Sequence, residues 1–573
     1  MNPGRRTGFW LPWLAVSRAE GAAGLVADAI AGLVVAILLV PQALAYAQLA
    51  ALPPQTGLYA GLLAPLAYAL CGASRVLAVG PVAVVSLMTA AAVGPVVAAT
   101  GAEPQAVALA LALAVGLFSL GFALLGLGAL AHFLSHPVIA GLMSASALLI
   151  AVGQARHLLG IAVDGATLPV LLPGLLTRLD QVNPLALAFG AGAIALLVLA
   201  GRGLAPLLQR LGLAGPTARL LARLAPVFVV LLAIGLVRGF GLEHALRTVG
   251  DIPPGLPGLT LPPADPAVWR AIAWPALLIA VIGFVESMAM AQTFAAPRRE
   301  RIDPAQELRG LGLANLAAAF SGAYPVSGGL SRTVIAAAAG ARSPLAGVLS
   351  AVALVPALLW ATPLLGALPQ AVLAATIVVP ILKLVDPPGL LRLWRYSRAD
   401  AAALAATGAG VLLLGVELGL LAGLAVSIGA FLLQASRPHY AIVGRVPGTE
   451  HYRNVLRHPV AGSQRVLTVR VDESLRFCNA AWLEDTVAQL VAGRPELTDV
   501  VLMCPGVNAI DASAFESLER IDARLRAGGL RLHLSEVKGP VMDRLAAAGL
   551  PQRLSGQVFL SQHQAMQALE GGR

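Results

Sequence analysis

Long runs of apolar residues recur through the first three quarters of this sequence. Residues 27–47 and 183–201 approach or reach the ~20 apolar residues that a helix needs to cross a bilayer. Of the 573 residues, 58% are hydrophobic and only 12% are charged, whereas a soluble domain has roughly 25% charged residues. The sequence therefore excludes a soluble globular protein and predicts an α-helical polytopic membrane protein.

The apolar runs end near residue 435, where charged and turn residues become frequent. From residue 465 onward, strand-like stretches such as "RVLTVRV" alternate with stretches of helical spacing, which predicts a small α/β domain. The expected domains are a cytoplasmic N-terminal segment over 1–24, a transmembrane domain over 25–435, a linker over 436–465 and the α/β domain over 466–573.

About fourteen spans are expected, several of them shorter than the usual ~17–25 residues, which suggests broken helices. Arginines follow the even-numbered spans, for example at Arg75, Arg202 and Arg298. Because basic loops face the cytoplasm, these loops and both termini are expected on the cytoplasmic side. The net charge of +10 is accordingly assigned to loops that face anionic lipid, and no nucleic-acid partner is expected.

Two proline-containing segments, residues 76–90 and 322–336, have similar sequence patterns. Pro81 and Pro325 each separate two short apolar runs, in spans three and ten. These spans are equivalent positions of two seven-span halves, and an odd number of spans gives the halves opposite orientations. A single segment of this kind would indicate an ordinary proline kink, but a matched pair favours the inverted repeat of a secondary transporter. Proline starts helices, so two helix N-termini are expected to face one spot suited to an anion.

Three blocks of the chain, residues 28–88, 307–347 and 508–521, resemble the sulfate permease (SulP) family of anion transporters with a C-terminal STAS domain. The resemblance implies 7+7 inverted repeats, with a core of spans one to four and eight to eleven and a gate of the other spans. It also implies a homodimer in a bacterial inner membrane, with the STAS domain in the cytoplasm.

The resemblance places an anion between the starts of spans three and ten, lined also by span one. The matching positions are Gln42, Tyr46, Pro81, Val82, Ala83, Val326, Ser327, Gly328, Gly329, Leu330, Ser331 and Arg332. Amide and hydroxyl groups are neutral donors for an oxyanion, and glycine permits close backbone approach. Three alternatives remain open: Tyr46 as a packing aromatic, Ser331 bonded back to its own helix, and Arg332 as a structural ion-pair partner.

Glu286 falls in the middle of span eight. A carboxyl group at the bilayer centre is costly to ionise, so it is expected to be protonated, paired or solvated. The resemblance supports a role in binding the coupling ion, with a proton as first choice and sodium possible. A purely structural pair with Arg332 is the competing interpretation.

The three cysteines lack metal-ligand spacing, and the sequence contains no phosphate-binding loop and no nucleophile elbow. We therefore expect no metal site, no cofactor and no enzymatic activity. In the STAS-like segment, Ser513 aligns with a serine that is phosphorylated in bacterial anti-sigma-factor antagonists. A helix N-cap role for Asp511 or Ser513 is the interpretation favoured by the residues.

These features favour a secondary active transporter of small anions, with proton symport as the expected coupling. Sulfate is the first candidate substrate, and bicarbonate and C4-dicarboxylates are alternatives. Two other functions remain open: an anion channel or uniporter, and a membrane-anchored sensor that signals through its STAS domain.

Overall fold

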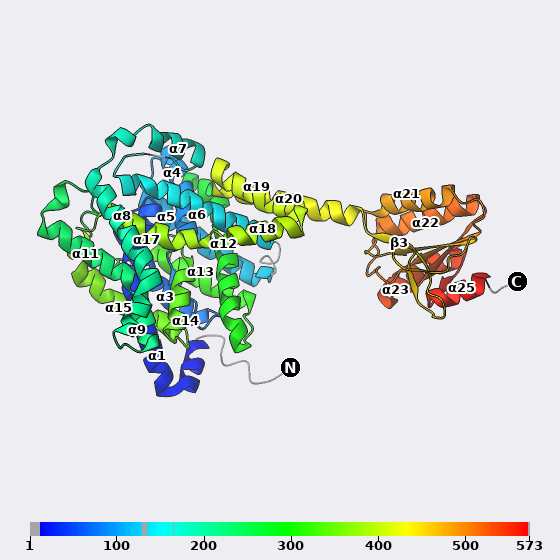
Figure 1. Cartoon of the computed structure of the whole chain (residues 1–573), viewed down its shortest axis with the longest axis horizontal. Helices are drawn as coiled ribbons and strands as arrows, with labels where there is room; N and C mark the ends of the chain where they lie inside the picture. The colour runs from blue at the N-terminus through cyan, green and yellow to red at the C-terminus, as the bar shows by residue number, and fades with distance from the viewer. Residues whose placement is uncertain (1–11, 129–134, 164, 571–573) are drawn as a thin grey trace. The chain divides into compact units, whose positions relative to one another are not determined.

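A computed structural model of the chain describes residues 12–128, 135–163 and 165–570. The chain divides into two compact units, Met1–Ser427 and Ile428–Arg573. The first unit is built from helices and one pair of very short strands, β1 (Val79–Gly80) and β2 (Ser327–Gly328), and the second contains a six-stranded sheet (Figure 1). The predicted fold class, a helical membrane protein with a C-terminal α/β domain, is confirmed.

The helices of the first half of the membrane unit mostly have a proline at the first or second position, which suits the first helical turn because the N–H that proline lacks would have no partner there. They are α1 (Pro12–Leu49), α2 (Pro54–Ala60), α3 (Leu63–Cys71), α4 (Ala83–Thr100), α5 (Pro104–Leu124), α6 (His136–Leu159), α7 (Leu168–Leu176), α8 (Pro184–Leu199), α9 (Ala205–Arg210), α10 (Gly215–Arg223) and α11 (Ala225–Gly239).

The second half repeats this use of proline, and several of its helices have side-chain caps. Asp265 accepts a hydrogen bond from the first turn of α12, and Asp303 does the same for α13. The helices are α12 (Pro266–Ala295), α13 (Pro304–Phe320), α14 (Leu330–Ala338), α15 (Leu345–Pro356), α16 (Thr362–Leu365), α17 (Gln370–Ile381), α18 (Pro387–Tyr396), α19 (Arg398–Leu414) and α20 (Val416–Ser436).

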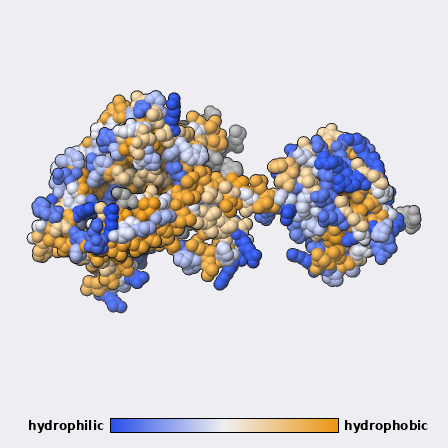
Figure 2. Space-filling model, turned by 90° about the horizontal axis from the view of Figure 1, so that it is seen from above, coloured by the Kyte–Doolittle hydropathy of each residue, from blue (hydrophilic) through white to orange (hydrophobic). Residues whose placement is uncertain are grey.

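Within the described residues, nine helices are long and apolar enough to cross a membrane, or ten if the bent pair that ends in α11 counts as one span. Four further expected spans coincide with the shorter helices α3, α13, α14 and α19, of 9, 17, 9 and 17 residues. The count of fourteen stays a prediction. Figure 2 shows apolar residues over much of the visible surface of this unit.

Helices from the two halves pack together into the expected groups. In the core group, α5 contacts α12 and α13, and α1 contacts α14 and α15. In the gate group, α6 contacts α17 and α19, and α8 contacts α17. Small residues permit close helix crossings: a Cβ atom on Gly116 of α5 would lie only 3.0 Å from the carbonyl oxygen of Gly312 on α13.

The tail unit has strand order β4-β3-β5-β6-β7-β8, with β5 to β8 parallel and β3 antiparallel to both of its neighbours. Its strands are β3 (Tyr440–Arg445), β4 (Tyr452–Asn454), β5 (Val466–Val471), β6 (Asp499–Met503), β7 (Arg531–Ser535) and β8 (Val558–Phe559). Its helices are α21 (Ala480–Ala492), α22 (Ala512–Ala527), α23 (Gly539–Ala547), α24 (Leu550–Arg553) and α25 (Gln562–Glu570).

The segment 436–465, expected to be a linker, supplies β3 and β4 to this sheet. Strand β3 belongs to the domain because its residues Ala441 and Val443 are buried, with 3% and 6% exposure. It also pairs antiparallel with β5 and so supplies hydrogen-bond partners to the backbone at that edge of the sheet. Polar residues flank these strands, so the sequence pattern did not indicate them.

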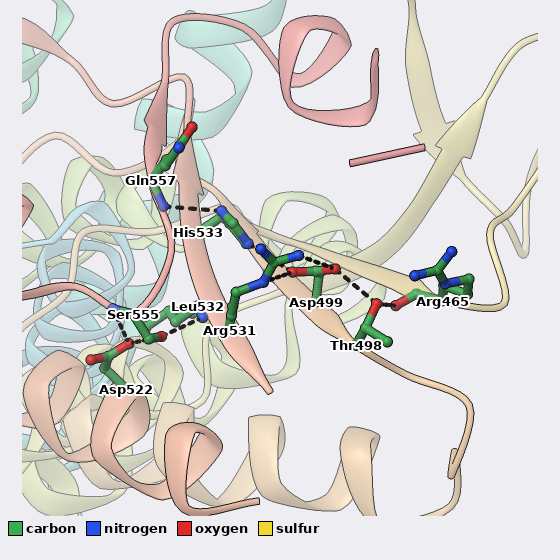
Figure 3. Close-up of polar contacts among 9 residues, drawn as sticks. All are labelled: Arg465, Thr498, Asp499, Asp522, Arg531, Leu532, His533, Ser555 and Gln557. Carbon is green, nitrogen blue, oxygen red and sulfur yellow. Dashed lines mark hydrogen bonds and ion pairs between the residues drawn. The ribbon is translucent and has the colours of Figure 1, made fainter. Parts of the chain in front are cut away.

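A buried polar network joins β6 to β7 (Figure 3). The carboxylate of Asp499, 1% exposed, accepts hydrogen bonds from Arg531 and from Nε2 of His533 at 2.8 and 3.0 Å. The backbone N–H of Gln557 donates to Nδ1 of His533, so the ring carries its hydrogen on Nε2. Burial alone would raise the pKa of Asp499, but these hydrogen bonds outweigh it and hold the pKa below its ordinary value.

Candidate functional site

The strands β1 and β2 bring together two segments that lie almost 250 positions apart in the sequence. They pair antiparallel, with Val79 opposite Gly328 and Gly80 opposite Ser327. One more hydrogen bond, from the N–H of Gly329 to the carbonyl oxygen of Ala78 at 2.9 Å, extends the pairing. The two proline segments that the sequence matched therefore meet in space.

Each strand leads directly into a helix that starts inside the unit. The N-cap residues are Val82 for α4 and Gly329 for α14, and neither helix has a side-chain cap. The N–H groups of a first helical turn have no intrahelical partner, and here no side chain caps them. Two positive helix ends with free donors lie beside the same strand pair, an arrangement that suits an anion.

Arg332, in the first turn of α14, is 2% exposed. Its Nη1 donates to the carbonyl oxygen of Pro81 at 2.6 Å, which ties α14 to the segment before α4. Its Nη2 is buried without a hydrogen-bond partner among the described residues. An unpaired guanidinium N–H in a buried place is costly, so it is a donor available to a ligand or to water.

Two polar side chains hold the β2 segment in place, and a third binds the residue that precedes β1. Asn315 of α13 bonds both the N–H and the carbonyl oxygen of Val326, at 2.9 and 3.0 Å. Ser287 of α12 accepts from the N–H of Gly328 at 2.9 Å. Thr333 accepts from the N–H of Ala78 at 3.1 Å. These bonds satisfy several polar groups of the irregular backbone around β1 and β2, as the interior of a membrane protein requires.

Gln42, Tyr46 and Ser331 are half-buried. The amide nitrogen of Gln42, on α1, lies 3.5 Å from the hydroxyl oxygen of Ser331, so α1 reaches the start of α14. Its amide oxygen is buried without a partner in the described part of the chain. These groups add neutral hydrogen-bonding capacity next to the helix ends.

Glu286 projects from α12 and is half-buried, and its Oε2 atom is buried with no hydrogen-bond partner among the described residues. No ion pair within 4.0 Å joins Glu286 to Arg332 in the described structure. The contact expected of a structural pair is therefore not formed here.

Eight of the twelve predicted site residues fall into two groups, and the other four, Pro81, Val82, Gly329 and Arg332, are buried. Val326, Ser327 and Gly328 are buried, and their polar groups are occupied by Asn315, Gly283 and Ser287. Gln42, Tyr46, Ala83, Leu330 and Ser331 are half-buried. The first group holds the scaffold and the second borders the space beside the helix ends, where binding of an anion stays a prediction.

Sequence reasoning missed several residues that brace this region. Asn315 is one, and the buried hydrogen bond from Ser86 of α4 to the hydroxyl of Tyr324, at 3.2 Å, is another. Each is a polar residue inside an otherwise apolar stretch, which was the available signal. Across the described residues, no group of three or more His, Cys, Asp or Glu side chains forms a possible metal site.

Comparison with known proteins places these elements in a wider group. Residues 25–407 match the family model described as Sulfate permease family, and residues 458–565 match the STAS domain. Sulfate transporter 4.1, chloroplastic, of Arabidopsis thaliana is 31% identical over 556 residues, covering 94% of this chain and 79% of the relative. Probable sulfate transporter Rv1739c of Mycobacterium tuberculosis is 32% identical over 573 residues, covering 99% of both chains.

Solved structures share the fold. The murine Slc26a9 anion transporter, in an inward-facing state, superposes with a TM-score of 0.88 at 23% identity, covering 98% of this chain and 94% of that one. The transmembrane domain of the cyanobacterial bicarbonate transporter BicA superposes with a TM-score of 0.59 at 22% identity, covering 71% of this chain and 98% of that one.

Proposed function

This chain belongs to the sulfate permease family and carries a C-terminal STAS domain, and we propose that it is a secondary active transporter of small anions. Sulfate is the first candidate, because relatives that match over nearly the whole of this chain are named as sulfate transporters. Bicarbonate and C4-dicarboxylates present similar oxyanion oxygens and are the alternatives. The observation that carries the proposal is the pairing of β1 with β2, which sets two uncapped helix N-termini beside one spot.

The anion binds between the starts of α4 and α14. Its oxygens accept hydrogen bonds from first-turn N–H groups and from the side chains of Gln42, Tyr46 and Ser331. The Nη2 group of Arg332, which has no partner among the described residues, adds a charge-assisted donor. Because most donors are neutral, binding is strong enough to select an anion and weak enough to release it.

Glu286 carries the coupling proton. An ionised carboxylate without a close cation is costly in this setting, so the neutral acid is favoured when the site is closed to water. Glu286 precedes Ser287 on α12, and Ser287 accepts a hydrogen bond from the N–H of Gly328, so the coupling residue and a residue that holds β2 lie on the same helix. Sodium is the alternative coupling ion.

Alternating access results from movement between the core and gate groups of helices. The anion site lies on core elements α1, α4 and α14, whereas α6, α8, α17 and α19 form the gate. Displacement of the core against the gate would carry the site between the two membrane faces. We also propose a bacterial inner-membrane location, cytoplasmic termini and a homodimer.

Uptake by the purified chain in liposomes tests this function. Labelled sulfate, bicarbonate and a C4-dicarboxylate are offered separately, with an inward proton gradient, an inward sodium gradient or neither. The proposal predicts accumulation of one anion above equilibrium under the proton gradient. Currents too large for a carrier would indicate a channel instead, and anion binding without flux would indicate a sensor.

A further inference from the structure

An apolar groove of about 860 Å³ runs along the seam between α8 and α11. Its walls include large hydrophobic side chains with high exposure, such as Leu199 at 66% and Phe228 at 57%. A second apolar hollow of about 220 Å³ shares Leu196, Val229 and Leu232 with the groove and extends it along the same two helices.

The groove is open because the helix changes its winding at this point. A π-helical turn, η4 (Ala200–Leu204), follows α8 and interrupts its regular hydrogen bonding. Gly203 within this turn lines the groove, and a Cβ atom placed there would meet no other atom within 4 Å. The lack of a side chain leaves room for a ligand against the backbone.

One end of the groove is strongly basic. Arg210 lines it, Arg202 lies in the π-helical turn, and Arg219 and Arg223 follow on α10, which packs against η4 and α9. None of these four arginines makes a hydrogen bond or an ion pair with any residue that the structure describes. The sequence also has no Asp or Glu between residues 181 and 242, so the positive charge is not offset locally.

We propose that this groove is a binding site for one anionic phospholipid, with its acyl chains against the leucines and its phosphate at Arg202 and Arg210. Guanidinium groups bind phosphate in a bidentate manner, and basic pockets between membrane helices select anionic headgroups. The site lies on gate helices and involves none of the residues assigned to the transported anion. It is therefore independent of the proposed function.

Native mass spectrometry of the full chain in detergent tests the site, with phosphatidylglycerol or phosphatidylcholine added. The parent is expected to retain phosphatidylglycerol more tightly than phosphatidylcholine. Arg202→Gln combined with Arg210→Gln is expected to lower the affinity for phosphatidylglycerol roughly 30-fold, at about five-fold per arginine. The matched control, Arg392→Gln with Arg395→Gln on α18, is expected to retain it like the parent.

A second pair of variants tests the groove without touching charge. Gly203→Phe fills the groove and is expected to reduce lipid retention. Gly201→Phe does not line the groove, and its Cβ would also meet no atom within 4 Å, so it is expected to have no effect. The proposal would be overturned if the two lipids were retained equally. It would also be overturned if Gly203→Phe and the double arginine variant both retained phosphatidylglycerol like the parent, because the groove would then contact lipid without selectivity.

Discussion

Arg332 of α14 donates a hydrogen bond to the carbonyl oxygen of Pro81, 2.6 Å away, across the two halves of the membrane unit. This bond fixes a positive charge between the starts of α4 and α14 and leaves Nη2 without a partner in the described structure. The same side chain therefore serves the scaffold through one nitrogen and is available to a ligand through the other.

Replacement of Arg332 separates these two roles. Arg332→Ala should weaken anion affinity about ten- to a hundredfold, the range for loss of a charge-assisted hydrogen bond. Membrane insertion should persist, because removal of a buried charge lowers the cost of insertion. Arg332→Lys keeps the charge without the fork of donors and should retain intermediate affinity. Labelled-anion binding and transport measure both variants. Parent-like affinity in a folded Arg332→Ala protein would remove this residue from the site.

Glu286→Gln tests the coupling ion. The amide is always neutral, so it mimics the protonated acid but cannot release a proton. We expect uptake driven by an inward proton gradient to disappear while anion binding survives. Glu417→Gln is the control, because Glu417 is also a half-buried membrane acid but lies on α20. Gradient-driven uptake that is unchanged in Glu286→Gln would exclude the proton role.

Two adjacent glycines should respond differently to a side chain. A Cβ atom on Gly328 would lie 2.8 Å from Leu77 and 2.9 Å from the hydroxyl of Ser287, so Gly328→Val should disrupt the pairing of β1 with β2 and lower thermal stability. The sequence analysis placed Gly328 in the anion site, and the structure directs an added side chain at this position against Leu77 and Ser287 instead.

Gly329→Ala acts on the ligand side of the same segment. The added Cβ would lie 2.7 Å from Nη2 of Arg332, the end of a flexible side chain that can move. We expect near-parent thermal stability with reduced anion affinity, because the guanidinium group shifts. If Gly328→Val is as stable as the parent, or Gly329→Ala unfolds, the assignment of these two roles is wrong.

The boundary of the tail domain can be tested by expression. Residues 437–573 include β3 and β4 and should form a soluble, folded domain. Residues 466–573 expose the edge of β5 that β3 covers, so this shorter piece should be less stable or aggregate. Thermal unfolding and size-exclusion chromatography compare the two. Equal stability would show that β3 and β4 are dispensable.

Acid should destabilise the tail domain through His533. Burial lowers the pKa of His533 below its ordinary value of 6.5, although its hydrogen bond to Asp499 opposes the shift. A lowered pKa means that the unfolded chain binds the proton more readily, so this contribution is present above pH 6.5 and is lost as the pH falls below it. His533→Gln should flatten the pH dependence of the stability of residues 437–573 below pH 6.5 in urea unfolding. An unchanged pH dependence would contradict this.

The sequence predicted those features that depend on pattern and on matched prolines. Apolar runs located many of the spans, and Pro81 and Pro325 located the two segments that the structure joins. The helix start expected at Pro325 was wrong in position, because β2 intervenes and α14 begins only at Leu330. The cap on α22 also followed from residue type, since Asp511 accepts a hydrogen bond from the N–H of Ala514 at 2.9 Å.

Long-range contacts of single residues could not be predicted from the sequence. The bond from Arg332 to Pro81 joins positions 251 residues apart, and local spacing contains no information on such a contact. Asn315 likewise appears as an isolated polar residue in a helix until its contact with Val326 is seen. The strands β3 and β4 were missed because their short apolar patterns are surrounded by charged residues.

The most direct test of the anion site measures whether sulfate protects a cysteine at position 331 from labelling by a thiol reagent. Cys71, Cys478 and Cys504 are replaced by alanine, Ser331→Cys is introduced, and its rate of labelling by a small thiol reagent is followed with and without sulfate. Ala338→Cys, exposed at the far end of α14, is the control. The anion site predicts that sulfate slows labelling at position 331 and leaves position 338 unchanged. Equal labelling rates at position 331, in protein that still transports sulfate, would contradict an anion site between α4 and α14.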